Sequence, residues 1–189
     1  MHIKRSGLLI GGLIAAVAAS FLRTHHPAAQ PVGPGAPMAP AMSVSPAGQV
    51  CDPSLWAHVY AGRFGKPQDR LRVNHPCATI TGVIDPVHPP AREADGDWHI
   101  RLIVDPPFAV MLNAKNLSGQ HGDLVLEPVC SNQVTQRDTL DEGVCDGFTQ
   151  QIYRPAMIGQ HVMVTGVYVT DMEHGWNEIH PVTSIVIIP

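Results

Sequence analysis

The stretches HVMVTGVYVTD (161–171) and WNEIHPVTSIVII (176–188) decide the fold. Polar and apolar residues tend to alternate along both, and Gly166 lies at the centre of the first. A period of two predicts β-strands, and His174-Gly175 predicts the turn that joins them. A glycine inside a long strand is typical of a bulge or a barrel corner.

Three further stretches predict strands: 78–85, 98–105 and 122–130. Helical segments are expected after Asp52-Pro53, over 106–117 and near 155–158. Five strands with central glycines, at Gly82 and Gly166, predict a mainly β fold: a five-stranded, OB-fold-like Greek-key barrel with short helices. A two-sheet sandwich is the alternative. The 16 residues 106–121 replace the hairpin usual between the second and third strands, and we interpret them as an inserted helix.

The chain divides by composition into three parts. Residues 1–23 combine Lys4 and Arg5 with a 16-residue uncharged run, which is typical of a cleaved signal peptide or a retained N-terminal membrane anchor. Residues 24–50 form a Pro/Ala-rich linker expected to be disordered and extended. Residues 51–189 form the OB-fold-like domain, with the barrel at about 77–189. The protein is therefore expected outside the cytoplasm, either anchored or secreted.

Cysteine and charge usage narrow the function classes. Four cysteines after an export signal indicate two disulfides, and the most local of three pairings is Cys51–Cys77 with Cys130–Cys145. The domain has nine Lys and Arg against all 16 Asp and Glu, a formal charge of −7. An acidic domain repels phosphate backbones, so nucleic acid is a disfavoured partner.

The block HGWNEIHPV (174–182) holds the main candidate site. Alternation places Trp176, Glu178 and His180 on one face of the last strand. His99 and Glu127, on neighbouring strands, could complete a metal or acid–base site with them. The competing interpretation is a buried polar network that closes the barrel. The ligand-binding candidates are Trp98, His99, Arg101, Glu127, His174, Trp176, Glu178 and His180, and the metal candidates are His99, Glu178 and His180.

A second candidate is the acidic loop EADGDWH (93–99). Glu93, Asp95 and Asp97 are spaced like calcium ligands, but no EF-hand loop surrounds them, so we interpret the loop as a solvated hairpin turn.

Four blocks, which begin at Cys77, Asp95, Gly122 and His174, resemble an uncharacterised exported OB-fold-like family of bacteria and archaea. The HGWxEIHPV-type block at the C-terminal end is the most specific of them. The resemblance implies the fold and an extracytoplasmic location, and it implies no reaction.

We expect the protein to be a non-enzymatic binding or interaction module. Its ligand, or its partner protein in the cell envelope, is unknown. OB barrels bind through the second and third strands and through two loops, here 86–97 and 171–175. The acidic first loop favours a cationic, metal or carbohydrate ligand. One alternative is a metal-dependent hydrolase that binds a divalent metal at a His/Glu site on strands 2 and 5, formed by His99, Glu178 and His180. Another is single-stranded nucleic-acid binding by analogy of fold.

Overall fold

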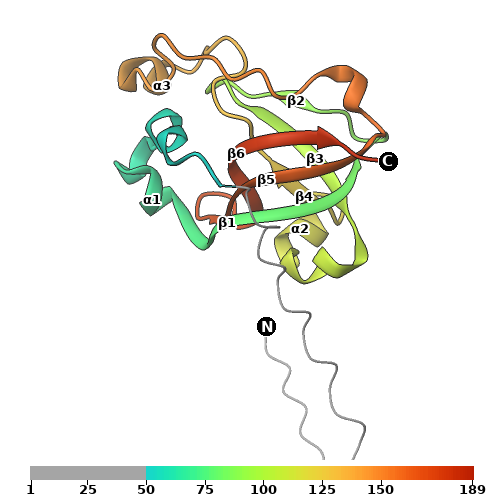
Figure 1. Ribbon diagram of the computed structural model, residues 1–189. Helices are drawn as coiled ribbons and strands as arrows, with labels where there is room; N and C mark the ends of the chain where they lie inside the picture. Colours follow the sequence, from blue (N-terminus) through green and yellow to red (C-terminus); the bar gives the residue numbers. More distant parts are fainter. Residues whose placement is uncertain (1–49) are drawn as a thin grey trace, which may run out of the picture. The chain divides into compact units, whose positions relative to one another are not determined.

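The computed structural model describes residues 50–189 (Figure 1). The expected leader (1–23) and linker (24–50) lie outside the described residues, apart from Val50. The described part is mainly β, and its centre is a closed five-stranded barrel. The strands follow one another around the barrel in the order β1 (Leu71–Ile84), β5 (His161–Asp171), β6 (Asn177–Ile187), β4 (Leu124–Leu126) and β3 (Trp98–Val104).

The pairing of β1 with β3 closes the barrel at Gly82, which lies opposite Val104. All pairings are antiparallel except that of β4 with β6, where Val125 lies opposite Glu178. The two-residue strand β2 (Ala91–Arg92) adds to the outer part of β3. The expected mainly β barrel of five strands is therefore confirmed.

The helices of the described part are short. They are η1 (Pro53–His58), η2 (Gly62–Phe64), α1 (Pro67–Arg70), η3 (Pro106–Met111), α2 (Ala114–Gly119), α3 (Arg137–Glu142) and η4 (Pro155–Met157). Asp52 caps η1 by accepting a hydrogen bond from Ser54 N, and Pro53 opens the helix, as expected. Within residues 50–189, no helix has the length and apolar character needed to cross a membrane.

Two apolar clusters lie on opposite sides of the barrel wall. The interior is filled by side chains from every barrel strand, among them Ile80, Leu102, Leu126, Val164 and Ile179. A smaller cluster lies outside the wall and consists of Leu55, Val59, Leu71, Val129, Val167 and Val169. The wall around β6 and β5 is therefore buried on both faces.

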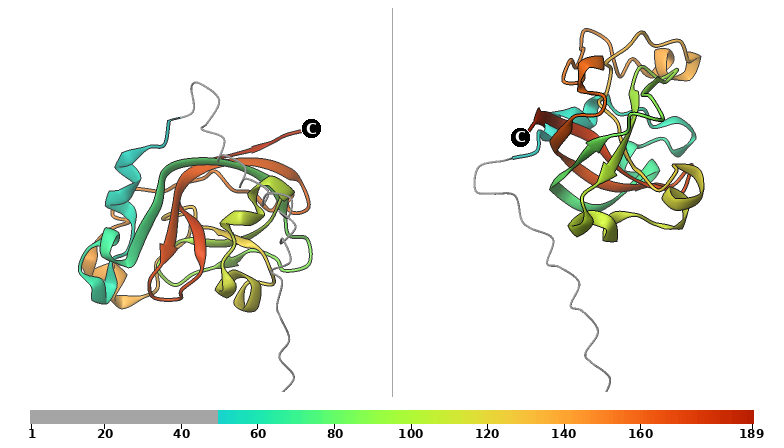
Figure 2. Two further views of the ribbon diagram at one scale, coloured as in Figure 1. Left: turned by 90° about the horizontal axis from the view of Figure 1, so that it is seen from below. Right: turned by 90° about the vertical axis from the view of Figure 1, so that its right-hand side faces the viewer.

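The outer cover comes from the N-terminal segment and from the β4–β5 connection (Figure 2). These two segments meet where the His58 ring stacks on Phe148 and Glu142 accepts hydrogen bonds from Ala61 N and Gly62 N. The disulfide Cys51–Cys77 ties the N-terminal segment to β1. The disulfide Cys130–Cys145 closes a 15-residue loop in the connection. The expected local pairing is confirmed.

Two strands differ in length from the expectation. The first strand begins at Leu71 rather than at residue 78. The alternation of polar and apolar residues is interrupted before residue 78, because the ladder with β5 shifts register around Pro76. The third spans Leu124–Leu126 rather than 122–130. Pro128 has no N–H to donate, and Cys130 has a φ of 48°, so neither extends a regular strand.

The expected helix over 106–117 is divided in two. Leu112 and Asn113 are extended, and the Asn113 side chain caps a new helix, α2, by accepting from Lys115 N and Asn116 N. The short apolar stripe of the segment does not support one continuous helix.

Replacing Gly166 with alanine should destabilise the barrel. The ladder with β6 shifts register at Gly166, and a Cβ there would lie 2.6 Å from the Pro181 carbonyl oxygen and would overlap the Ile179 side chain. Overpacking of this kind costs about 1–3 kcal/mol. We expect urea denaturation of Gly166→Ala to show a loss of that size. Gly119→Ala is the control, since its Cβ meets nothing within 4 Å; equal stability of the two variants would contradict the prediction.

Candidate functional site

The outer face of β6 carries the centre of the candidate site. Ile179 points into the barrel core, so its neighbours Glu178 and His180 point outward, and both are fully buried by the outer cover. The β4–β5 connection closes over them, and Gln150 Nε2 donates a hydrogen bond to the Val182 carbonyl at 2.9 Å. The parallel pairing of Leu126 with Ile179 brings Glu127 to the same place.

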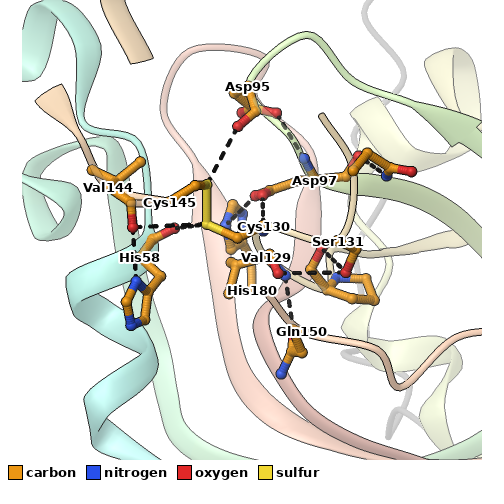
Figure 3. The surroundings of a disulfide bond; sticks show 12 residues. His58, Asp95, Asp97, Val129, Cys130, Ser131, Val144, Cys145, Gln150 and His180 are labelled. Carbon is orange, nitrogen blue, oxygen red and sulfur yellow. Dashed lines mark hydrogen bonds and ion pairs between the residues drawn. A yellow bond between two sulfur atoms is a disulfide. The ribbon is translucent and has the colours of Figure 1, made fainter. Parts of the chain in front are cut away.

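His180 is surrounded by carboxyl groups. Its Nδ1 lies 2.7 Å from Glu127 Oε2 and 3.1 Å from Glu178 Oε1, and its Nε2 lies 3.4 Å from Asp97 Oδ2. Asp97 precedes β3 and is itself held by the Cys130 backbone N–H, which donates to Asp97 Oδ1 at 2.7 Å (Figure 3). Three strands and one disulfide thus fix the surroundings of a single imidazole ring.

His99 extends this cluster toward the surface. Its Nδ1 lies 3.4 Å from Glu127 Oε1 and 3.3 Å from Glu93 Oε1. Its Nε2 contacts Gln120 Oε1 at 2.9 Å, and Arg101 Nε donates to the same oxygen. Glu127 therefore bridges His99 and His180.

Arg70 and Asp171 form a second part of the buried layer. Arg70 Nη2 lies 3.3 Å from Asp171 Oδ2, and the two side chains are 4% and 1% exposed. His174 Nδ1 contacts the same Asp171 oxygen at 3.0 Å, and the His174 ring stacks on Trp176. The Trp176 indole N–H donates to Glu178 Oε2 at 2.9 Å, which joins the two parts.

Burial and charge shift the pKa values of these groups in opposite directions. Burial raises the pKa of Asp97 to about 7 and also raises the pKa of Glu178. Burial would raise the pKa of Glu127 as well, but His180 and His99 hold it well below its ordinary value. Burial would lower the pKa of His180, but Glu127 and Asp97 raise it well above 6.5. The cluster thus favours charged histidines around one carboxylate, Glu127.

An acidic pocket of about 330 Å³ lies at the surface beside the buried layer. It is lined by Tyr60, Arg70, Glu93, Ala94, Asp95, Gln136, Glu173 and His174. Five of these residues come from the loop before β3 and the loop after β5. We call it the two-loop pocket. Glu93 links it to the cluster through His99, and Arg70 links it to Asp171.

Six of the eight expected ligand-binding residues meet in this region: His99, Glu127, His174, Trp176, Glu178 and His180. Trp98 lies elsewhere, in a hollow of about 520 Å³ with Arg92 and Arg154, where it meets Tyr153 edge-on. Arg101 reaches the cluster only through Gln120.

The potential metal-ligating groups within residues 50–189 are three sets: Asp85, His88 and Asp123; Glu93, His99 and Glu127; and Asp97, Glu127 and His180. None of these sets contains Glu178, and His99 and His180 fall in different sets. Of the expected set, Glu178 and His180 are in direct contact, whereas His99 is joined to His180 through Glu127.

The sequence patterns gave no indication of Arg70 or Asp171, and they suggested the wrong burial for the acidic loop (93–99). The antiparallel pairing of β2 with β3 confirms the expected hairpin turn, but Asp95 and Asp97 are 6% and 2% exposed, so the turn is not a solvated one. One signal was available: Asp97 and His99 are two residues apart and share a face, like Glu178 and His180. Arg70 and Asp171 are 101 residues apart, and no local pattern connects them.

Comparison of the chain with protein-family models, curated proteins and solved structures gave no match. The family resemblance and the site assignments made from the sequence stay predictions.

Arg70→Met should strongly destabilise the protein. The substitution keeps an unbranched apolar stem but removes the buried guanidinium from Asp171, which is left with His174 as its one charged partner at the same oxygen. Breaking a buried ion pair typically costs about 3–5 kcal/mol. Urea denaturation measures the loss. Arg63→Met is the control, because the Arg63 side chain is 68% exposed and pairs with Glu173 at 3.6 Å, so its loss should cost under about 1 kcal/mol. Similar losses for both variants would contradict the buried pair.

His174 should titrate above its ordinary pKa of 6.5. The hydrogen bond to Asp171 raises this pKa, burial acts against it, and Glu127 and Arg70 contribute with opposite signs. A raised folded pKa stabilises the fold fully below the unfolded value, and this contribution is lost as the pH rises through the folded value. NMR titration should give a midpoint above 6.5 that falls in Asp171→Asn. A midpoint at or below 6.5 would refute the contact.

Proposed function

We propose that the protein is an exported, tethered, OB-fold-like binding module that takes a small cationic ligand in the two-loop pocket. The leader (1–23) and the linker (24–50) support export and tethering. The two disulfides also support export, because disulfides persist in oxidising compartments.

The strand pairing supports the OB-fold-like description. The first, second and third barrel strands pair in sequence as β1, β3 and β4, and the last strand, β6, pairs parallel with β4 and antiparallel with β5. The loops that OB folds use for binding are then the one before β3 and the one after β5. Both contribute to the two-loop pocket.

The observation that carries the proposal is the meeting of three carboxylates in this pocket. Glu93 and Glu173 have side chains about one-third exposed, at 33% and 35%, and Asp95 lies beneath them at 7%. Arg70 also faces the pocket, where it donates to the Tyr60 carbonyl at 3.0 Å and lies 3.9 Å from Glu173 and 4.0 Å from Asp95. Its closest carboxylate, at 3.3 Å, is Asp171, which lies outside the pocket lining. The accessible carboxylates of Glu93 and Glu173 are hydrogen-bond acceptors, which suits an ammonium or guanidinium group.

The other functions considered from the sequence fit less well. A hydrolase that uses Glu178 and His180 requires substrate to reach side chains that have no exposed surface. A single-stranded nucleic acid requires basic residues beside its stacking aromatics. Trp176 instead lies among Glu178, His174 and His99.

The proposal is tested with 1,4-diaminobutane, a dication, and with 1,4-butanediol as its uncharged counterpart. Binding is followed by NMR shifts of the pocket residues, in EDTA and at low salt. We expect the diamine to bind and the diol not to bind. Glu173→Gln and Glu93→Gln should each weaken diamine binding about tenfold, equivalent to about 1.4 kcal/mol.

Asp138→Asn is the matched control, because Asp138 is an exposed acid on α3 outside the pocket lining. It should bind the diamine as the unaltered protein does. Equal binding of the diol, or an equal loss in all three variants, would refute a cation site in the two-loop pocket.

A further inference from the structure

Three residues of the buried cluster offer ligand atoms to a common centre. Asp97, Glu127 and His180 each have one suitable atom, and the three atoms lie within 4.8 Å of one another. Asp97 comes from the chain before β3, Glu127 from the end of β4, and His180 from β6. The residues are 2%, 2% and 0% exposed, so this site is distinct from the two-loop pocket above it.

Each of the three residues has one buried polar atom that lacks a hydrogen bond. Asp97 Oδ1 accepts from Cys130 N–H, whereas Asp97 Oδ2 has no hydrogen-bond partner. His180 Nδ1 pairs with Glu178 Oε1, whereas Nε2 has no hydrogen-bond partner. Glu127 Oε1 lies 3.4 Å from His99 Nδ1, and Oε2 lies 2.7 Å from His180 Nδ1 in an ion pair but has no hydrogen-bond partner.

We propose that Asp97 Oδ2, Glu127 Oε2 and His180 Nε2 bind a divalent transition-metal ion of the Zn²⁺ type. Buried polar atoms are rarely left unpaired, and one ion satisfies all three of these at once. The ion takes the place of a proton on Nε2, because a ligating imidazole is neutral.

The spacing of the atoms fits such an ion. Donors about 2.0–2.2 Å from a tetrahedral Zn²⁺ ion lie about 3.3–3.6 Å apart. His180 Nε2 and Asp97 Oδ2 are separated by 3.4 Å, which lies in this range. Glu127 Oε2 lies 2.7 Å from Nδ1 of the same ring, and one ligand atom of each of the three residues lies within 4.8 Å of the others.

The groups behind the three ligands fit as well. Ligating histidines usually donate their second N–H to a carboxylate, which fixes the ring. Glu178 provides that carboxylate, and the Trp176 indole N–H holds Glu178 in turn. The Cys130 N–H fixes Asp97 in the same way, and the disulfide Cys130–Cys145 fixes Cys130.

One imidazole and two carboxylates favour Zn²⁺ over Ca²⁺. Ca²⁺ requires six to eight oxygen ligands, and a buried histidine does not supply them. The local charge also favours a cation. The buried layer contains one arginine and two histidines. Against them stand five buried carboxyl side chains, those of Asp95, Asp97, Glu127, Asp171 and Glu178.

Because the ligands are buried, the ion is best supplied while the chain folds. The full chain is unfolded in EDTA under non-reducing conditions, which keeps the disulfides, and is then refolded with Zn²⁺, with Ca²⁺ or without metal. After gel filtration, we expect about one Zn²⁺ per chain by elemental analysis and a higher melting temperature than in the metal-free sample. Ca²⁺ should give neither effect.

Asp97→Asn is the test variant. It keeps the acceptor for Cys130 N–H and replaces the ligand oxygen, so Zn²⁺ affinity should fall by more than about tenfold. Asp123→Asn is the control, because Asp123 is a buried acid outside the proposed set and belongs to the separate group of Asp85, His88 and Asp123. Its affinity should stay within about threefold of the unaltered protein.

An anomalous difference map from a crystal of the Zn²⁺-refolded protein tests the site even if Asp97→Asn does not fold. A peak among Asp97, Glu127 and His180 supports the proposal. Three outcomes would overturn the proposal. They are the absence of stoichiometric Zn²⁺, a peak at Asp85, His88 and Asp123 alone, and an unchanged Zn²⁺ affinity in a folded Asp97→Asn variant. Diamine binding is measured in EDTA, so either result can fail without the other.

Discussion

The buried imidazole of His180, enclosed by the carboxyl groups of Asp97, Glu127 and Glu178, is the interaction on which the rest of the structure depends. Removing four ionisable groups from water is costly unless each meets an opposite charge or a hydrogen bond. Three different strands must therefore be in register before this region is stable. Such a constraint favours one arrangement of the barrel over others that would bury the same apolar surface.

The elements outside the barrel serve this constraint. The β4–β5 connection excludes water from the outer face of β6, and its disulfide fixes the backbone N–H that holds Asp97. The second apolar cluster, around Leu55 and Val169, secures the N-terminal segment over the same wall. Arg70 and Asp171 continue the buried polar layer to the edge of the two-loop pocket. The floor of that pocket is thus part of the buried layer.

Local patterns predicted the barrel and the central residues well. Alternation placed Glu178 and His180 on one face, and a period of two is a property of the strand itself. The same patterns could not predict that both faces of β6 are buried, because this depends on a covering segment that contains no regular strand. Asp97 was misjudged for the same reason, since its loop is typical of a solvated turn until the connection closes over it. The Arg70–Asp171 pair joins positions 101 residues apart, and nothing local to either position indicates its partner.

The formal charge of −7 takes on a different meaning once burial is known. Of the 16 acidic residues of the domain, seven are buried, and of its nine basic residues only Arg70 is buried. Nine acidic and eight basic residues therefore remain at least partly exposed, so the outer surface is close to neutral. General repulsion by the surface is then a weak argument against a phosphate backbone. The stronger argument is local: the carboxylates of Glu93, Asp95 and Glu173 meet in the two-loop pocket, where an anion would be repelled at short range.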